Sequence, residues 1–200
     1  MWARVSSKER ESGEADWGGW DLLTFDAGKH RLFISRSDRV MVVDTQDGKL
    51  LGTITDTQGV HGIALVPSLG RGYTSNGRAN TLTEFDLTTL KTVRTLPAGG
   101  ENPDVIMYDD HARQLFSFNG RSNDVSVIDP VSGNLVTVFA LGGKPAFAVT
   151  NVAAQLFVNI DDTASIKLID PPTHNAPAQR TLPRAETRPR VARHVKIERT

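Results

Sequence analysis

The chain has 200 residues, 38% of them hydrophobic, and equal numbers of acidic and basic residues give it a formal net charge of zero. This composition is typical of a globular protein and excludes a wholly disordered chain. No apolar run approaches the roughly 18 residues that a membrane-spanning helix needs. The sequence has no cysteine, which excludes disulfides, thiolate metal sites and a cysteine nucleophile.

Residues 1–18 are predicted as a polar N-terminal extension. The segment Met1–Gly19 contains basic residues but lacks the apolar stretch of a signal peptide. Taken as written, this N-terminus predicts a protein that stays in the cytoplasm.

Residues 19–175 contain a repeat of about forty residues. Its clearest marker is the acidic residue at the end of the third apolar segment of each unit: Asp44, Asp86, Asp129 and Asp170. Short strands repeated at a period near forty are typical of β-propeller blades. We therefore predict an all-β fold, a β-propeller of about four four-stranded blades. The four acidic residues are expected to begin turns, since an aspartate side chain can bond its own backbone two residues on.

The fourth strand of each blade is predicted at Leu50–Ile54, Thr92–Leu96 and Leu135–Phe139 in the first three units. In the fourth unit, prolines 171, 172 and 177 stand where this strand should follow. Because proline cannot donate a ladder hydrogen bond, we expect the fourth blade to lack its fourth strand.

Two stretches carry a family resemblance. Arg71–Asp86 (RGYTSNGRANTLTEFD) and Leu115–Asp129, together with the segment Gly142–Pro145, resemble the YVTN-type β-propeller repeat. The resemblance implies a ring of about seven blades, and it implies export from the cytoplasm, to the periplasm or the medium. It specifies the fold and leaves the activity open.

Four blades are incomplete relative to such a seven-bladed ring. Three alternatives follow, favoured in this order: a truncated or frame-shifted piece of a longer propeller, two chains that close an eight-bladed ring, or a tight ring of four blades. Open blade edges also predict self-association, because propellers normally limit exposed edges by closing.

Residues 176–200 are predicted to be a disordered tail rich in proline and arginine. From Pro171 to Thr200 there are seven basic residues, two acidic residues and no aromatic residue. Such a segment buries too little apolar surface to offset the entropy lost on ordering. Nucleic acid is an expected partner only through this tail, which could also bind anionic lipid. An unselected or mistranslated end is favoured over both.

Polar residues gather at one end of the predicted blades. In an antiparallel blade, the loop before the first strand and the loop between the second and third strands emerge at the same end, around the central channel. The candidate ligand-binding residues in these loops are Asp21, His61, Arg78, Asn102, Asp104, Arg121 and Lys144. The Asn-Gly pairs at 76–77 and 119–120 are expected to make tight turns with positive φ. Arg78 and Arg121 could simply reflect duplication and solvation of the repeat.

No catalytic motif accompanies these residues: the sequence lacks a nucleophile elbow, a phosphate-binding loop and a His-Glu-x-x-His pair. We predict no catalytic residue, metal or cofactor. The expected function is that of a non-catalytic propeller protein that binds an unidentified small molecule or protein through its channel face. The alternative is a metal-dependent hydrolase like the related propeller lactonases, which would need Asp21, His61, Asn102 and Asp104 to converge.

Overall fold

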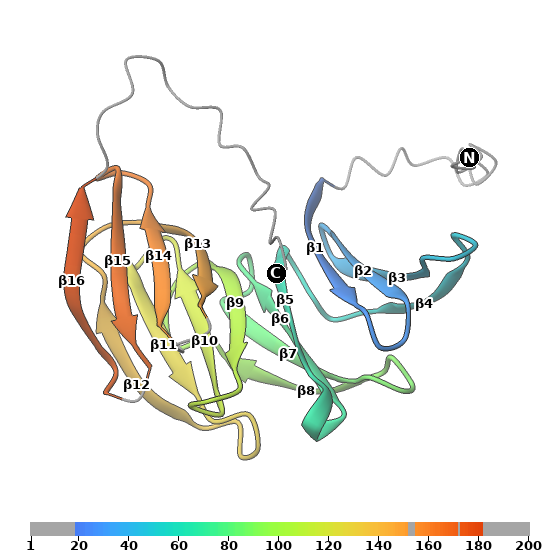
Figure 1. Ribbon diagram of the computed structural model, residues 1–200. Helices are drawn as coiled ribbons and strands as arrows, with labels where there is room; N and C mark the ends of the chain where they lie inside the picture. Colours follow the sequence, from blue (N-terminus) through green and yellow to red (C-terminus); the bar gives the residue numbers. More distant parts are fainter. Residues whose placement is uncertain (1–18, 152–154, 172, 182–200) are drawn as a thin grey trace.

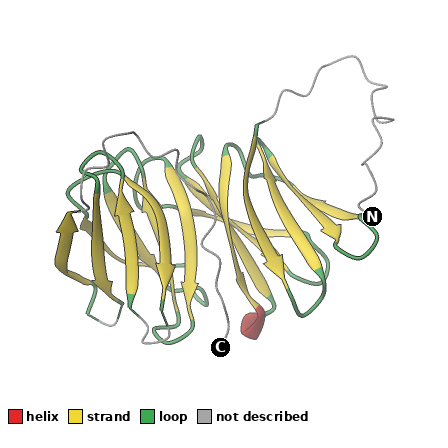
Figure 2. Ribbon diagram, turned by 45° about the horizontal axis from the view of Figure 1, so that its top comes forward, coloured by secondary structure: helices red, strands yellow, loops and turns green. Residues whose placement is uncertain are grey.

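The computed structural model describes residues 19–151, 155–171 and 173–181, and these form four sheets of four antiparallel strands each (Figure 1). The sheets are arranged as the blades of a four-bladed β-propeller, which confirms the predicted all-β fold. Figure 2 shows how little of the described chain is helical: a single 3-10 turn, η1 (Pro67–Leu69). Within these ranges no helix has the length and apolarity for a membrane crossing.

Each blade is a meander in which consecutive strands pair, with the first strand innermost. Blade 1 comprises β1 (Trp20–Asp26), β2 (Arg31–Arg36), β3 (Arg39–Asp44) and β4 (Leu50–Ile54). Blade 2 comprises β5 (Val60–Val66), β6 (Arg71–Asn76), β7 (Thr81–Asp86) and β8 (Thr92–Pro97). Blade 3 comprises β9 (Pro103–Asp109), β10 (Gln114–Asn119), β11 (Asp124–Ile128) and β12 (Leu135–Ala140). Blade 4 comprises β13 (Pro145–Thr150), β14 (Leu156–Ile160), β15 (Ser165–Asp170) and β16 (Asn175–Thr181).

The fourth blade has its fourth strand, so the predicted loss of this strand was wrong. β16 pairs with β15, with Lys167 opposite Gln179 and Leu168 opposite Ala178. Pro177 is tolerated because β16 is the outer strand of its sheet and because the register is irregular at this point. Residues 176–181 of the proposed tail therefore belong to blade 4. The rest of that tail, 182–200, and the predicted extension 1–18 lie outside the described residues.

Three of the four repeated aspartates begin turns in the predicted way. The Oδ1 atoms of Asp44, Asp86 and Asp129 each accept a hydrogen bond from the backbone N–H two residues later. In Asp86, bonds from the backbone N–H groups of Thr89 and Thr88 hold the pKa of the carboxyl below its usual value. These side chains are thus part of the repeat's architecture.

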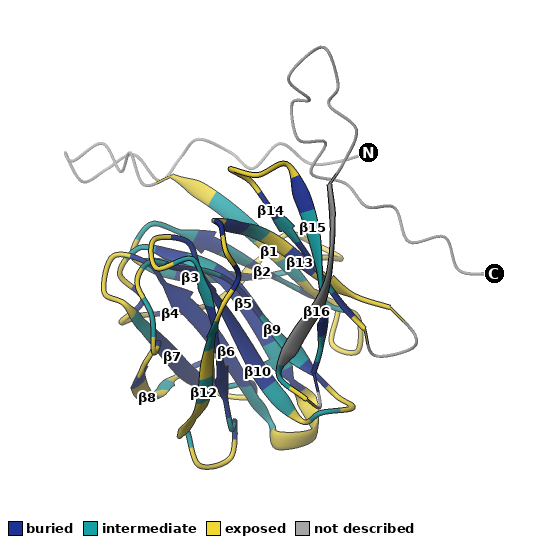
Figure 3. Ribbon diagram, turned by 90° about the vertical axis from the view of Figure 1, so that its left-hand side faces the viewer, coloured by how far each residue is buried: buried dark blue, intermediate teal, exposed yellow. Residues whose placement is uncertain are grey.

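Apolar side chains fill the junctions between consecutive blades. Each central strand presents one apolar row to the preceding blade and another to the following blade, and three clusters result, between blades 1 and 2, 2 and 3, and 3 and 4. Figure 3 shows buried residues concentrated in the middle blades, whereas β1 carries partly buried and exposed ones.

Blades 1 and 4 lie at opposite ends of the arc (Figure 1), and their outward faces remain exposed at Leu23, Phe25, Phe147 and Val149. The expectation of a tight four-bladed ring was therefore wrong, because such a ring would bury these side chains.

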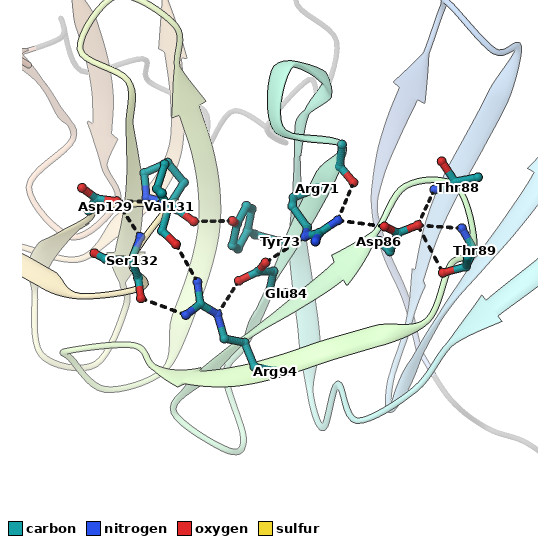
Figure 4. Close-up of polar contacts among 12 residues, drawn as sticks. Arg71, Tyr73, Glu84, Asp86, Thr88, Thr89, Arg94, Asp129, Val131 and Ser132 are labelled. Atoms are coloured by element: carbon teal, nitrogen blue, oxygen red, sulfur yellow. Dashed lines mark hydrogen bonds and ion pairs between the residues drawn. The ribbon is translucent and has the colours of Figure 1, made fainter.

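The junction between blades 2 and 3 also contains a charged cluster (Figure 4). The buried carboxylate of Glu84 accepts hydrogen bonds from Arg71 Nε at 3.1 Å and from Arg94 Nε at 2.6 Å. Arg94 reaches across to blade 3 and donates to the carbonyl oxygens of Ser132 and Val131. The cluster therefore joins two blades through charge as well as apolar packing.

The Tyr73 hydroxyl adds a second polar contact to this junction, a 2.7 Å hydrogen bond to the carbonyl oxygen of Pro130. Burial, followed by the charge of Glu84, raises the pKa of this phenol far above its usual value.

Candidate functional site at the channel mouth

The innermost strand of every blade is bulged near its first residues. In β1, Asp21 and Leu22 together lie opposite a single residue of β2, and the same irregularity places His61 at the bulge of β5 and Asp104 at that of β9. A bulge releases a residue from the ladder and re-aims its side chain. Three equivalent polar residues are thus presented at the same end of the channel. The fourth equivalent position holds Ala146.

Serine hydroxyls from the preceding blade hold two of these bulges. Ser35 of blade 1 donates a hydrogen bond to the backbone carbonyl of His61 at 2.6 Å, and Ser75 of blade 2 donates to that of Asp104. Gly62 completes the fit, because a Cβ at this position would lie 2.7 Å from the backbone nitrogen of Ile106. The placement of His61 and Asp104 is therefore fixed by blade-to-blade contacts.

Asp21 and His61 form an ion pair across blades 1 and 2. Asp21 Oδ2 lies 2.6 Å from His61 Nδ1, and both side chains are about 30% exposed. The hydrogen bond to Asp21, opposed by partial burial and aided by the negative charge of Asp104, raises the pKa of His61 above its usual value. The pair favours the imidazolium form while remaining accessible to solvent.

Asn102 and Lys144 continue this polar row toward blades 3 and 4. A Cβ at Gly77 would lie 2.7 Å from both Asn102 Oδ1 and His61 Nε2, so these two side chains flank the same glycine. The equivalent Gly120 lies against the Asn102 amide and the Lys144 side chain. We call Asp21, His61, Asn102, Asp104 and Lys144 the channel-mouth cluster.

The remaining candidates lie around this cluster. Arg78 and Arg121 are exposed on the turns between the second and third strands, at the rim. Lys144 Nζ lies 3.9 Å from Asp161 Oδ2, and its backbone N–H donates to Asp162. Five of the seven predicted residues are thus brought together, and the two arginines stand at the edge.

The Asn-Gly pairs differ from the prediction. Asn76 and Asn119 are buried at the ends of β6 and β10, where their amide groups donate to Thr83 and Ser126 in the adjoining strands. Positive φ occurs at the ends of the turns, including Asn80. The predicted turns are present, since the backbone N–H groups of Ala79 and Asn123 donate to the carbonyl oxygens of Asn76 and Asn119, but the predicted positive φ at 76–77 and 119–120 was wrong. The sequence did contain a signal for the side-chain contacts. Asn76 and Asn119 occupy equivalent repeat positions, and each is followed seven residues later by a hydroxyl residue, Thr83 or Ser126.

The channel mouth brings together charged and polar side chains from several blades. The described residues contain no group of three histidine, cysteine, aspartate or glutamate side chains placed to hold a metal ion. Two surface hollows, of about 390 and 500 Å³, lie elsewhere: one beside β4 and the turn after β7, the other beside the β1–β2 turn and η1. We regard the channel mouth as the stronger candidate for a ligand-binding site, because positive and negative side chains from several blades meet there.

Comparisons with known proteins bear on the fold alone. No protein-family model matches the sequence, and no curated protein matches it. Among solved structures, 1304 chains match, so the fold does not select one activity. One is Kuenenia stuttgartiensis Hydrazine Synthase, with a TM-score of 0.78 and 17% sequence identity over 86% of this chain. The match covers 52% of that chain, so this protein spans about half its length.

Proposed function

We propose that this protein is a non-catalytic β-propeller protein that binds a small polar ligand, or a polar segment of a partner protein, through the channel-mouth cluster. The observation that carries the proposal is the set of three bulges, which aim Asp21, His61 and Asp104 at one opening. A bulge gives up ladder hydrogen bonds, and bulges are over-represented beside functional sites.

The charges suggest what the ligand presents. Lys144 and the imidazolium of His61 offer donors, and Arg78 and Arg121 add positive charge at the rim. Asp104 and the Asn102 amide oxygen offer acceptors. A ligand with a carboxylate or phosphate, together with a hydrogen-bond donor, would satisfy both sets.

Thermal unfolding with simple probes tests the proposal. Succinate, inorganic phosphate and glycine each present part of the expected chemistry, and binding stabilises the folded state by about 2.7 kcal/mol at a hundredfold excess over Kd. We expect a saturable rise in Tm with at least one probe. The combined substitution His61→Asn and Lys144→Met should abolish it.

Lys29→Met provides the control, since Lys29 is exposed on the β1–β2 turn at the opposite end of the blades. A shift that persists in the double variant, or no shift with any probe, would reject the proposal.

The alternative, a lactonase-like metal-dependent hydrolase, receives less support. It needs a metal-binding set at the channel, and the described side chains are not gathered in that way. Divalent metal retained on the purified protein, together with lactone hydrolysis lost in Asp104→Asn, would favour it over simple binding.

We also infer that the repeat is of the YVTN type, and that the protein works outside the cytoplasm. Both rest on the resemblance at Arg71–Asp86 and Leu115–Asp129. Cell fractionation of the native host tests the location.

A further inference from the structure

The forward face of each blade, turned toward the next blade along the chain, carries an aromatic residue at the same repeat position. Phe33, Tyr73 and Phe116 stand in the second strand of blades 1, 2 and 3, and all three are fully buried against the following blade. Phe157 is the equivalent residue of blade 4, where it remains only half-buried. The forward face of blade 4 thus resembles the internal junction faces but has no facing blade within the described ranges.

Apolar residues extend over the rest of this forward face. The strand pairings place Phe147, Val149, Ile166 and Leu168 on the same side of the sheet as Phe157. Phe147 and Val149 are exposed, and Ile166 and Leu168 are half-buried. In blade 3 the counterparts of Phe147 and Leu168, Val105 and Val127, are buried in the junction with blade 4.

The backward face of blade 1 shows the complementary defect. Leu23 is 60% exposed, whereas its equivalents Ile63, Ile106 and Ala148 in the later blades are 5%, 4% and 7% exposed. Strand pairing places further apolar residues on this side of the sheet: Phe25, Leu32, Ile34, Met41 and Val43. An apolar face of this extent is typical of a protein–protein interface.

We propose that a second copy of this chain covers both faces. The forward face of blade 4 in one copy packs on the backward face of blade 1 in the other, and a two-fold axis along the channel repeats the contact. All three internal junctions already join a forward face to a backward face, so the new junctions use the same complementarity. Two such heterologous contacts close a ring of eight blades.

The curvature of the arc is compatible with a larger ring. The four blades superpose, at a TM-score of 0.78, on part of a longer solved chain, 52% of which the match covers. This arrangement of blades therefore also occurs within a longer chain and does not require closure after four. The inference is independent of the ligand proposed above.

Light scattering after size exclusion gives the first test. We expect a single species of twice the 21.8 kDa chain mass. Leu23→Asp and, separately, Phe157→Asp should each raise the dissociation constant at least a hundredfold, while Val136→Asp should not. Val136 is the matched control because it is similarly exposed, on the outer strand of blade 3. Leu23→Asp is not expected to disturb folding, since the Leu23 side chain is already exposed to water. Circular dichroism checks that this variant is folded.

Cross-linking then tests the orientation. The sequence has no cysteine, so single cysteines can be placed without background. A short bis-maleimide should join Leu23→Cys to Phe157→Cys in a mixture and should join neither variant to itself. A monomeric wild-type protein, masses that grow without limit with concentration, or self-linking of either variant would each overturn the two-copy ring.

Discussion

Two charged clusters lie at opposite ends of the blades, and they differ in how far water reaches them. The Glu84 side chain is only 6% exposed and is held by Arg71 and Arg94, whose guanidinium groups stay protonated at any ordinary pH. The Asp21–His61 pair is about 30% exposed and contains a group that titrates near neutrality. The first cluster joins two blades through permanently charged guanidinium groups, whereas the second contains a histidine and faces an opening.

Comparison of the repeats shows that the buried cluster lies at a position that is apolar in other blades. Glu84 occupies the place that Val42 holds in blade 1 and Val127 in blade 3, two residues before the turn aspartate. A carboxylate at an apolar position needs partners, and the two arginines supply them. The mouth has no such requirement, because its side chains reach water when no ligand is present.

The largest expected effect on stability comes from removing the two arginine partners of Glu84. The double substitution Arg71→Met and Arg94→Met leaves a buried carboxylate without its ion pairs, and should lower the free energy of unfolding by about 3–5 kcal/mol. Urea denaturation measures it.

Adding Glu84→Val to that double variant is the matched control. It restores the residue type of blade 3 and should return stability to within about 1 kcal/mol of the wild type, because an apolar set often replaces a buried ion pair without loss. If the double variant were as stable as the wild type, the contrast between the two clusters would fail.

A smaller effect is expected from the hydroxyl at the same junction. Tyr73→Phe removes the hydrogen bond to the Pro130 carbonyl and should cost about 0.5–1.5 kcal/mol. The reverse change, Phe116→Tyr at the equivalent position of blade 3, buries a hydroxyl among apolar neighbours and should also destabilise the protein. Equal stability of all three proteins in urea would mean that this junction does not depend on the tyrosine contact.

The channel mouth is expected to make the stability of the protein weakly dependent on pH. Because the pKa of His61 is raised in the folded protein, the Asp21–His61 pair stabilises the fold fully below about pH 6.5, the unfolded value, and loses this contribution as pH rises through the folded value. The difference in unfolding free energy between wild type and His61→Asn should shrink by about 1 kcal/mol or less from pH 5.5 to pH 8.5. A difference that grows with pH would contradict the assigned shift.

The smallest effect on stability, with a large effect on binding, is expected at Gly77. Gly77→Ala places a methyl group 2.7 Å from Asn102 Oδ1 and His61 Nε2, which lie at the far ends of their side chains and must shift to admit it. We expect a loss of less than about 1 kcal/mol in stability, within the range of mild substitutions, together with loss of any probe-induced rise in Tm. Gly28→Ala, on the exposed β1–β2 turn at the opposite end, has no positive φ and no close neighbour, and tests whether glycine replacement alone accounts for the change. Retained binding in Gly77→Ala would show that the mouth does not need its present shape.

Much of the fold was predictable because it is repeated. The period marked by the four turn aspartates, and the alternation of apolar residues within each unit, led to the correct strands in the first three blades. The prediction failed at Pro177, where the sequence does not reveal that the strand is the outer one and that its register slips.

The sequence predicted which residues gather at the channel mouth, but it did not predict that β-bulges position them. Strand direction correctly grouped Asp21 with His61, but nothing in the sequence distinguishes a bulged inner strand from a regular one. The roles of Asn76 and Asn119 were missed for a related reason, since their partners lie seven residues away across a hairpin. Local turn preference correctly predicted a turn after each asparagine, but it did not reveal these side-chain contacts.

The bulges also bear on how such a protein can change over evolutionary time. The same position has accepted aspartate, histidine, aspartate and alanine in four successive units, and the blade around it stays the same. Selection can therefore exchange one mouth residue at a time, with little penalty to folding, and duplication of a unit brings a fresh position of the same kind. The bulge positions of the four inner strands can therefore be substituted independently. Ligand recognition can change in this way while the β-propeller fold is retained.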